Sequence, residues 1–216
     1  PLRLHANWSC GPLPPLAKDV QTTVDQSKGA HPGDLQYGVD LDKLTGSDAF
    51  RRLGADQQAA AIDQFDRTVT QATKGGQPLD AGQKDQLRAL LGSSTFHDVN
   101  TRVQDRVLGL FSEFARGDGA AARLNGLKQL VDHAGFRALD DEAAEFQVLD
   151  AYQHDATFRA VVDKLTGRTD LPPADARTAL DLLTRVKANR QLYEKSNDGD
   201  KQKILEQTQP AIEKIG

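Results

Sequence analysis

The sequence predicts an all-α protein, built as an irregular helical repeat stack of the HEAT or armadillo kind or as a duplicated helical bundle. The first observation is a recurring sequence motif, in which a leucine stands six positions before a phenylalanine: Leu44 and Phe50, Leu90 and Phe96, Leu130 and Phe136. The second is that apolar residues recur at helical spacing along most of the chain. The third is that no run of alternating polar and apolar residues indicates a strand.

The repeated motif continues beyond each phenylalanine. An aliphatic residue follows after three positions and another after twelve: Leu53 and Ile62, Val99 and Leu108, Leu139 and Val148. A fourth copy has Leu165 six positions before Leu171, and the pentapeptide at 42–46 recurs whole at 163–167. Such self-similarity is typical of stacked helical units, which bury apolar faces against their neighbours.

The spacing of the copies favours an irregular stack. The leucines that open successive copies of the motif are 46, 40 and 35 residues apart, from Leu44 to Leu90, Leu130 and Leu165. A tetratricopeptide or ankyrin array keeps its period and its signature residues, and neither is found here. A globular helical domain that grew by duplication is the alternative architecture. Chance matches between leucine-rich helices are a simpler explanation, and the repeated pentapeptide argues against them.

The chain divides into a Pro/Gly-rich N-terminal segment, residues 1–34, and a helical repeat domain, residues 35–216. Prolines and glycines interrupt any regular pattern in the first segment. One short helix fits between Leu16 and Ser27, because Leu16, Val20 and Val24 recur four apart on one face.

From Asp34 onward the helical period dominates. The pattern predicts a helix from Asp34 to Leu44 that ends at Gly46, then a short turn carrying Phe50. A long helix follows over Ala55–Lys74 and is ended by the glycines and proline of 75–78. Asp80 and Gln83 then form a capping box for a helix that stops at Gly92.

The second half repeats this organisation. A helix begins near Asn100 and carries apolar residues as far as Phe114, and another covers the stripe from Leu124 to Val131. Asp140 or Asp141 caps a helix that includes Tyr152. Three further helices are expected: one over Thr157–Leu165, one opened by Pro172 and Pro173, and one over Ile204–Ile215 that Pro210 bends or shortens.

Composition indicates a polar, soluble chain. Its 216 residues include 27 basic and 31 acidic side chains, interspersed, for a net charge of −4. Because no basic stripe or tail stands out, we expect no nucleic-acid partner. No apolar run approaches the about 18 residues that cross a bilayer.

The cysteine and methionine counts bear on the origin of the chain. With one cysteine, Cys10, no internal disulfide can form, which excludes a disulfide-stapled secreted scaffold. The absence of methionine and the start at Pro1 predict a fragment or processed form. The composition has a bacterial character, and a cytoplasmic and a secreted location both stay open.

The segment from Asn7 to Pro12 reads Asn-Trp-Ser-Cys-Gly-Pro. It resembles the nucleophile segment of papain-like cysteine peptidases, in which the cysteine begins a helix that stabilises its thiolate. The resemblance implies Cys10 as the nucleophile. However, the prolines after Cys10 oppose a helix, and the family needs a histidine on a β-sheet that this sequence does not predict. We therefore favour an ordinary thiol.

Other chemistry-bearing residues do not form a recognisable site. No two of the five histidines (His5, His31, His97, His133 and His154) are three or four residues apart, so no metal site is expected. His97 and His133 are expected at helix junctions. The run Asn197–Asp200 is interpreted as a turn rather than a calcium loop, and without a phosphate-binding glycine loop no cofactor is expected.

The tightest group of carboxylates lies at one predicted helix start. Two acids held in a cleft can hydrolyse glycosides, but negative charge at this position is explained by the helix dipole. We therefore interpret the group as a cap. Its members are Asp140, Asp141, Glu142 and Glu145.

These observations favour a non-catalytic module that binds a protein, a peptide or another macromolecule, as part of a larger bacterial protein. Its binding face should carry polar side chains of successive units, and the candidates are Gln57, Gln58, Gln104 and Gln147. The alternatives are a hydrolase, such as a Cys10-dependent peptidase, and a segment of a secreted effector.

Overall fold

The computed structural model describes residues 15–139, 141–168, 171–195 and 198–199. All regular structure in these residues is helical, in twelve helices with no strand between them. The all-α prediction is therefore confirmed. None of these helices combines the length and the apolar character needed to cross a membrane.

Long and short helices alternate in a fixed order. Three consecutive groups each contain a long, a short and a long helix: α2 (Leu35–Thr45), α3 (Asp48–Arg51) and α4 (Ala55–Lys74); α5 (Ala81–Leu91), α6 (Ser94–Asp98) and α7 (Thr101–Phe114); α8 (Ala120–Asp132), α9 (Ala134–Arg137) and α10 (Glu142–His154). One helix, α1 (Lys18–Ala30), precedes them. Two more follow, α11 (Ala156–Thr166) and α12 (Pro173–Lys195).

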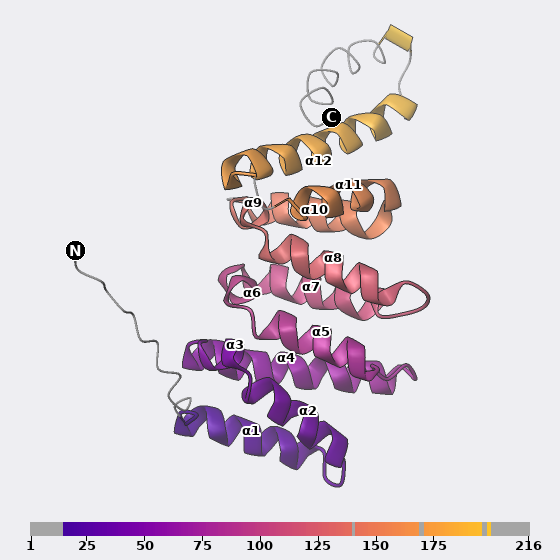
Figure 1. Ribbon diagram of the computed structural model, residues 1–216. Helices are drawn as coiled ribbons and strands as arrows, with labels where there is room; N and C mark the ends of the chain where they lie inside the picture. Colours follow the sequence, from indigo (N-terminus) through magenta and orange to yellow (C-terminus); the bar gives the residue numbers. More distant parts are fainter. Residues whose placement is uncertain (1–14, 140, 169–170, 196–197, 200–216) are drawn as a thin grey trace, which may run out of the picture.

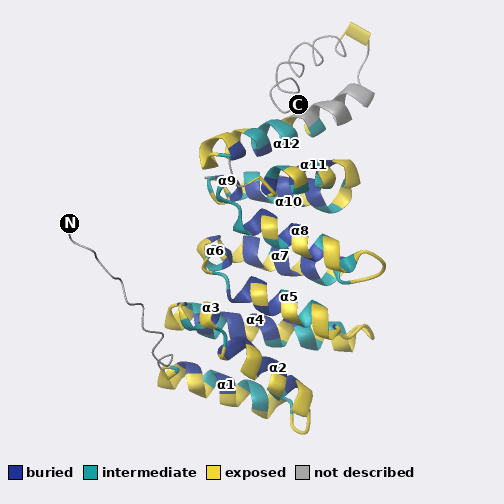
Figure 2. Ribbon diagram, viewed as in Figure 1, coloured by how far each residue is buried: buried dark blue, intermediate teal, exposed yellow. Residues whose placement is uncertain are grey.

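The long helices pack in two rows along the stack (Figure 1). In one row α2, α5, α8 and α11 contact one another in succession, and in the other α1, α4, α7, α10 and α12 do so. Each internal helix therefore buries apolar surface against the helix before it and the helix after it in its row. Figure 2 shows buried residues recurring in helix after helix along the whole stack.

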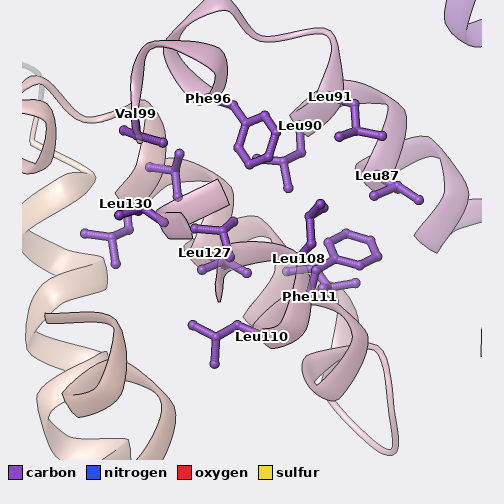
Figure 3. Packing of buried hydrophobic residues seen from close by; sticks show 14 of the residues in the cluster. Leu87, Leu90, Leu91, Phe96, Val99, Leu108, Leu110, Phe111, Leu127 and Leu130 are labelled. Atoms are coloured by element: carbon purple, nitrogen blue, oxygen red, sulfur yellow. The ribbon is translucent and has the colours of Figure 1, made fainter. Parts of the chain in front are cut away.

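Each short helix of the three groups carries one of the phenylalanines. Phe50 on α3, Phe96 on α6 and Phe136 on α9 have no exposed surface. Figure 3 shows the Phe96 ring directed into the hydrophobic cluster, toward Leu90 of α5. Burying a phenylalanine side chain contributes about 1.5–3 kcal/mol. The aliphatic residues three and twelve positions later are buried as well: Leu53, Val99, Leu139, Ile62, Leu108 and Val148.

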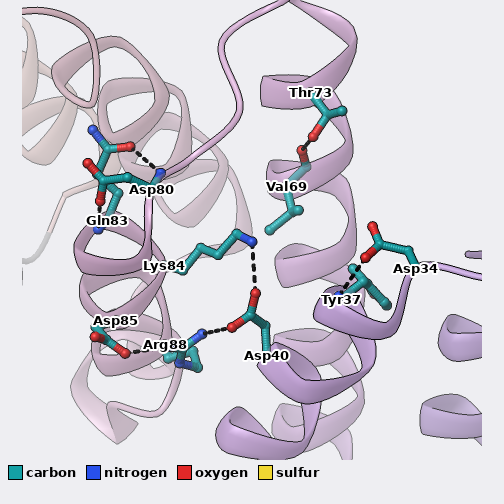
Figure 4. Close-up of polar contacts among 10 residues, drawn as sticks. All are labelled: Asp34, Tyr37, Asp40, Val69, Thr73, Asp80, Gln83, Lys84, Asp85 and Arg88. Carbon is teal, nitrogen blue, oxygen red and sulfur yellow. Dashed lines mark hydrogen bonds and ion pairs between the residues drawn. The ribbon is translucent and has the colours of Figure 1, made fainter.

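Several predicted helix ends are present. The predicted span Ala55–Lys74 is that of α4, and Gly46 follows α2 as its C-cap. The Asp80 carboxylate accepts from the Gln83 amide N–H at 2.8 Å, and the Gln83 side chain accepts from the Asp80 N–H at 2.9 Å, which completes the capping box (Figure 4). The Asp141 side chain caps α10 by accepting from Ala143.

The N-terminal helix is joined to the rest of the core. It starts at Lys18, two residues later than the predicted start, and runs to Ala30. Its Val20 and Val24 are buried, and α1 packs along α4. The predicted division at residue 34 therefore falls between two helices of one hydrophobic cluster. Residues 1–14 and the predicted helix over Ile204–Ile215 lie outside the described residues.

Helices α9 and α12 lie in close contact at Gly135. A Cβ atom added to Gly135 of α9 would lie 2.5 Å from the Ala176 Cβ and 2.9 Å from the backbone nitrogen of Arg177. The backbone of α12 leaves no space for any side chain at this point. Gly109 of α7 is a contrasting case, because a Cβ added there meets no atom within 4 Å.

We expect Gly135→Ala to destabilise the fold and Gly109→Ala to stabilise it. Overpacking against the α12 backbone should lower the free energy of unfolding by about 1–3 kcal/mol. An alanine at exposed, helical Gly109 should raise it by up to about 1 kcal/mol, because alanine has the higher helix propensity. Urea unfolding followed by circular dichroism measures both. Equal effects of the two substitutions would contradict the close α9–α12 contact.

Candidate functional site

Two of the four candidate glutamines are buried and tie helices together. The Gln58 side-chain amide donates to the Phe50 carbonyl at 3.1 Å, and the Gln104 amide donates to the Val99 carbonyl at 2.9 Å. Gln64 in turn donates to the Gln104 side-chain oxygen at 2.9 Å. We expected Gln58 and Gln104 on an exposed face. Because both amides satisfy backbone carbonyls at the end of a short helix, neither is placed to contact a partner.

The other two candidates differ in exposure. Gln57 is half-buried, and its side-chain oxygen accepts from the Gly54 N–H at 3.1 Å, which closes the first turn of α4. Gln147 is exposed on α10 and lines a groove. Of the four glutamines, Gln147 is therefore the one whose side chain lies on a hollowed surface.

This groove runs between α7, α10 and α12, which are successive members of one row, and has a volume of about 550 Å³. Half-buried Phe146 and the alanines Ala151 and Ala188 supply apolar surface in it. The polar side chains that line it are Arg106, Gln147, Asp150, Thr184 and Lys187. A lining that combines apolar surface with a few polar side chains is usual for a ligand-binding groove.

Two of the charged side chains that line the groove, Arg106 and Asp150, pair with each other. Asp150 lies 3.7 Å from the Arg106 guanidinium and 3.3 Å from His154 Nδ1. Arg106 also donates to Gln153. The Lys187 ammonium lies 5.9 Å from the centroid of the Phe158 ring. The rim therefore offers both signs of charge, with hydrogen-bond donors and acceptors on one surface.

A polar network at the other end of the stack includes a histidine, a serine and an aspartate. Asp66 accepts from the Tyr37 hydroxyl at 2.9 Å and lies 2.5 Å from His31 Nε2, while the His31 and Tyr37 rings stack at 3.9 Å. Ser27 bonds to the Tyr37 hydroxyl and not to His31. No base therefore contacts the serine, and the network links α1, α2 and α4. Burial raises the pKa of Tyr37, and Asp66 adds to that effect.

The remaining histidines of the described chain have structural contacts. His97 Nε2 lies 2.8 Å from the Leu91 carbonyl, and His133 Nδ1 accepts from the Gly135 N–H at 3.1 Å. Both stand at junctions with short helices, and burial lowers the pKa of both. In the described part of the chain, no three His, Cys, Asp or Glu residues are arranged to hold a metal ion. Cys10 and His5 lie outside it.

An ion-pair cluster that the sequence did not reveal joins α2 to α5 (Figure 4). The buried Asp40 carboxylate lies 2.8 Å from the Lys84 ammonium and 3.1 Å from the Arg88 guanidinium. Burial alone would raise the pKa of Asp40, but the hydrogen bond from Lys84 and the two positive charges hold it below its usual value. The partners are 44 and 48 residues apart in sequence, so no local pattern could indicate them.

The carboxylates at the start of α10 have three different roles. Asp141 caps the helix, as expected. Glu142 lies 3.5 Å from Arg102 on α7, and Arg102 is exposed while Glu142 is half-buried. Glu145 is only 7% exposed and has no hydrogen-bond or ion-pair partner among the described residues. Asp140 lies outside them.

Glu145 lines a pocket of about 450 Å³ at the junction of α6, α7, α9 and α10. Burial raises the pKa of this carboxyl to about 7, and the negative charges of Glu142 and Asp141 add to the effect. The sequence placed Glu145 in a helix cap. The one signal that could have set it apart is its place as the fourth residue of α10, where its own N–H already bonds to the Asp141 carbonyl and needs no cap.

We expect Glu145→Gln to change how stability depends on pH. The folded state holds the Glu145 proton up to about pH 7 and the unfolded state releases it near 4.5, so between these values the folded state binds more protons. Wild-type stability is therefore full below pH 4.5 and falls as pH rises through 7, by on the order of 3 kcal/mol. Glutamine does not titrate, so the stability of the variant should not fall in this way as the pH rises.

Urea unfolding between pH 5 and pH 8 tests this expectation. The stability difference between Glu145→Gln and wild type should grow as pH rises. Glu113→Gln is the matched control, because Glu113 is exposed on α7, and it should keep the wild-type pH dependence. Parallel stability curves for wild type and Glu145→Gln would contradict the buried, unpaired state of this carboxyl.

Two surfaces thus stand out in the described residues: the α7–α10–α12 groove and the Glu145 pocket. Known proteins add no relative from which a function could be transferred. No family model matches the chain, and no curated protein or solved structure is similar to it at a significant level.

Proposed function

We propose that the chain is a non-catalytic binding module that holds a segment of another protein in the α7–α10–α12 groove. The observation that carries this proposal is the groove itself. Its apolar residues and its side chains of both charges come from three successive helices of one row. An extended peptide can bury an apolar side chain on Phe146 while its backbone bonds to Gln147.

We further propose that the stack is an irregular helical repeat of the HEAT or armadillo kind. Its support is the long–short–long order that occurs three times and the buried phenylalanine in each short helix. Gln58 and Gln104 add to this, because each stands eight residues after a phenylalanine and makes the same type of bond. The unequal long helices α4, α7 and α10, with 20, 14 and 13 residues, make the repeat irregular. Surfaces formed by successive repeats commonly bind other macromolecules.

The polar contacts of the described residues favour binding over catalysis. A nucleophile needs a base within hydrogen-bond reach, and Ser27 instead bonds to a tyrosine hydroxyl. The clusters around Asp40 and Asp66 join neighbouring helices, and their polar groups bond to one another. The Cys10-dependent hydrolase and the bacterial or effector origin stay predictions from sequence.

A site-specific photo-crosslinker tests the proposed groove. We expect benzoylphenylalanine in place of Gln147 to form a covalent adduct with a discrete protein in an extract of the source organism. The matched control replaces Gln26, an exposed glutamine on α1 at the far end of the stack, and should give about tenfold less of that adduct.

A charge reversal in the groove provides a second test of the proposed binding site. Lys187→Glu alters the rim without touching the core, because Lys187 is half-buried at the groove edge. It should reduce the adduct at position 147 several-fold while circular dichroism stays unchanged. Equal adducts at positions 147 and 26, or an adduct insensitive to Lys187→Glu, would count against the groove as the binding site.

A further inference from the structure

The Glu145 pocket has features that the fold does not account for. A carboxyl group buried without a partner costs several kcal/mol if ionised, so proteins pair such groups or leave them protonated. Glu145 is more than nine-tenths buried, makes no bond to a described residue, and lines the pocket. The other buried acid of the described residues, Asp40, has two cationic partners. Among these residues, Glu145 is therefore the buried acid without a counter-charge.

The other residues that line the pocket determine which charge a ligand should carry. Four carboxyl groups line the pocket: that of Asp98 on α6, that of Asp141 at the N-cap of α10, and those of Glu142 and Glu145 on α10. One guanidinium, that of Arg137 on α9, lines it as well. Arg102 on α7 pairs with Glu142 at 3.5 Å and is 80% exposed. The net charge of the lining is negative whether or not Glu145 is ionised. A cationic ligand is therefore favoured.

We propose that this pocket binds the guanidinium group of an arginine side chain that a partner protein presents. Both oxygens of the Glu145 carboxylate are available, and a planar guanidinium can donate to both at once. Guanidinium is also more weakly hydrated than ammonium, so it enters a buried site at lower cost. Divalent metals are disfavoured, because the described carboxylates are not arranged to hold one.

The ligand is a side chain within a polypeptide, which rests on the binding function proposed above. The guanidinium of free arginine would meet the same carboxyl groups of Asp98 and Glu142, and its α-ammonium and α-carboxylate together add no net charge. Free arginine is therefore a comparison ligand in the test below. The site does not depend on the α7–α10–α12 groove, because no residue lines both. Either binding site can therefore be disproved without affecting the other.

Arginine binding should depend on pH. The bound form needs ionised Glu145, whose proton passes to solvent as the guanidinium enters. Because burial and the adjacent acids raise the pKa of Glu145 to about 7, about one tenth of the protein is ionised there at pH 6 and about nine tenths at pH 8. The charges that face it are those of Asp98, Arg137, Asp141, Glu142 and, at the rim, Arg102.

The test uses the full chain and the peptide acetyl-Gly-Gly-Arg-Gly-Gly-amide. Val99 and Leu139 line the pocket, so their ¹³C-methyl resonances report binding directly. We expect these methyl signals to shift on titration, with an affinity about tenfold higher at pH 8 than at pH 6. A peptide with citrulline in place of arginine has the same shape without the charge and should give no shift.

Variants complete the test. Glu145→Gln keeps the shape of the protonated side chain and should abolish the shifts at pH 8, whereas Glu113→Gln should leave the affinity unchanged. Shifts that persist in Glu145→Gln, or that are equal for the citrulline peptide, would overturn the proposal. Equal binding of a lysine peptide would overturn the guanidinium assignment, and tighter binding of free arginine would overturn the protein partner.

Discussion

The buried phenylalanine of each short helix is the contact on which the geometry of the stack depends. Phe50, Phe96 and Phe136 stand where the chain passes from one row of long helices to the other. A fully buried ring fixes the short helix against its neighbours, and this sets the direction in which the next long helix leaves. In the first two groups a glutamine amide secures the same junction, because Gln58 and Gln104 donate to carbonyls at its end.

Buried and half-buried polar groups also hold neighbouring helices together. Asp132 of α8 accepts from Ser93 at 2.8 Å, and the Tyr152 hydroxyl donates to Asp163 at 2.6 Å, so that α8 is tied to the α5–α6 junction and α10 to α11. A buried hydrogen bond to a charged group contributes about 1.5–3 kcal/mol, and losing one partner costs more. Polar groups with such partners stabilise the fold and are not available to a ligand. Surfaces for function are therefore found where a partner is missing or where a groove stays open.

Sequence reasoning succeeded where the determinants were local. The helical period located the long helices, and the glycines after Lys74 together with the Asp80–Gln83 box placed their ends. It did not separate buried from exposed glutamines, because Gln58 and Gln104 lie in register with polar positions and bond to carbonyls brought close only by the turn at the short helix. The Asp40 ion pairs were missed because they join residues far apart in the chain.

The Glu145 pocket was missed for a related reason, and the comparison of the three groups explains where it lies. Eight residues after its phenylalanine, the third group has Ala144 where the first two have Gln58 and Gln104. No amide bridges from that position to the end of α9, and the pocket lies there beside Leu139, the counterpart of Val99. The next residue is Glu145, buried and without a partner. The third junction thus lacks the structural amide, and the pocket beside it, which Val99 of the second junction also lines, has the space and the unpaired charge that a ligand needs.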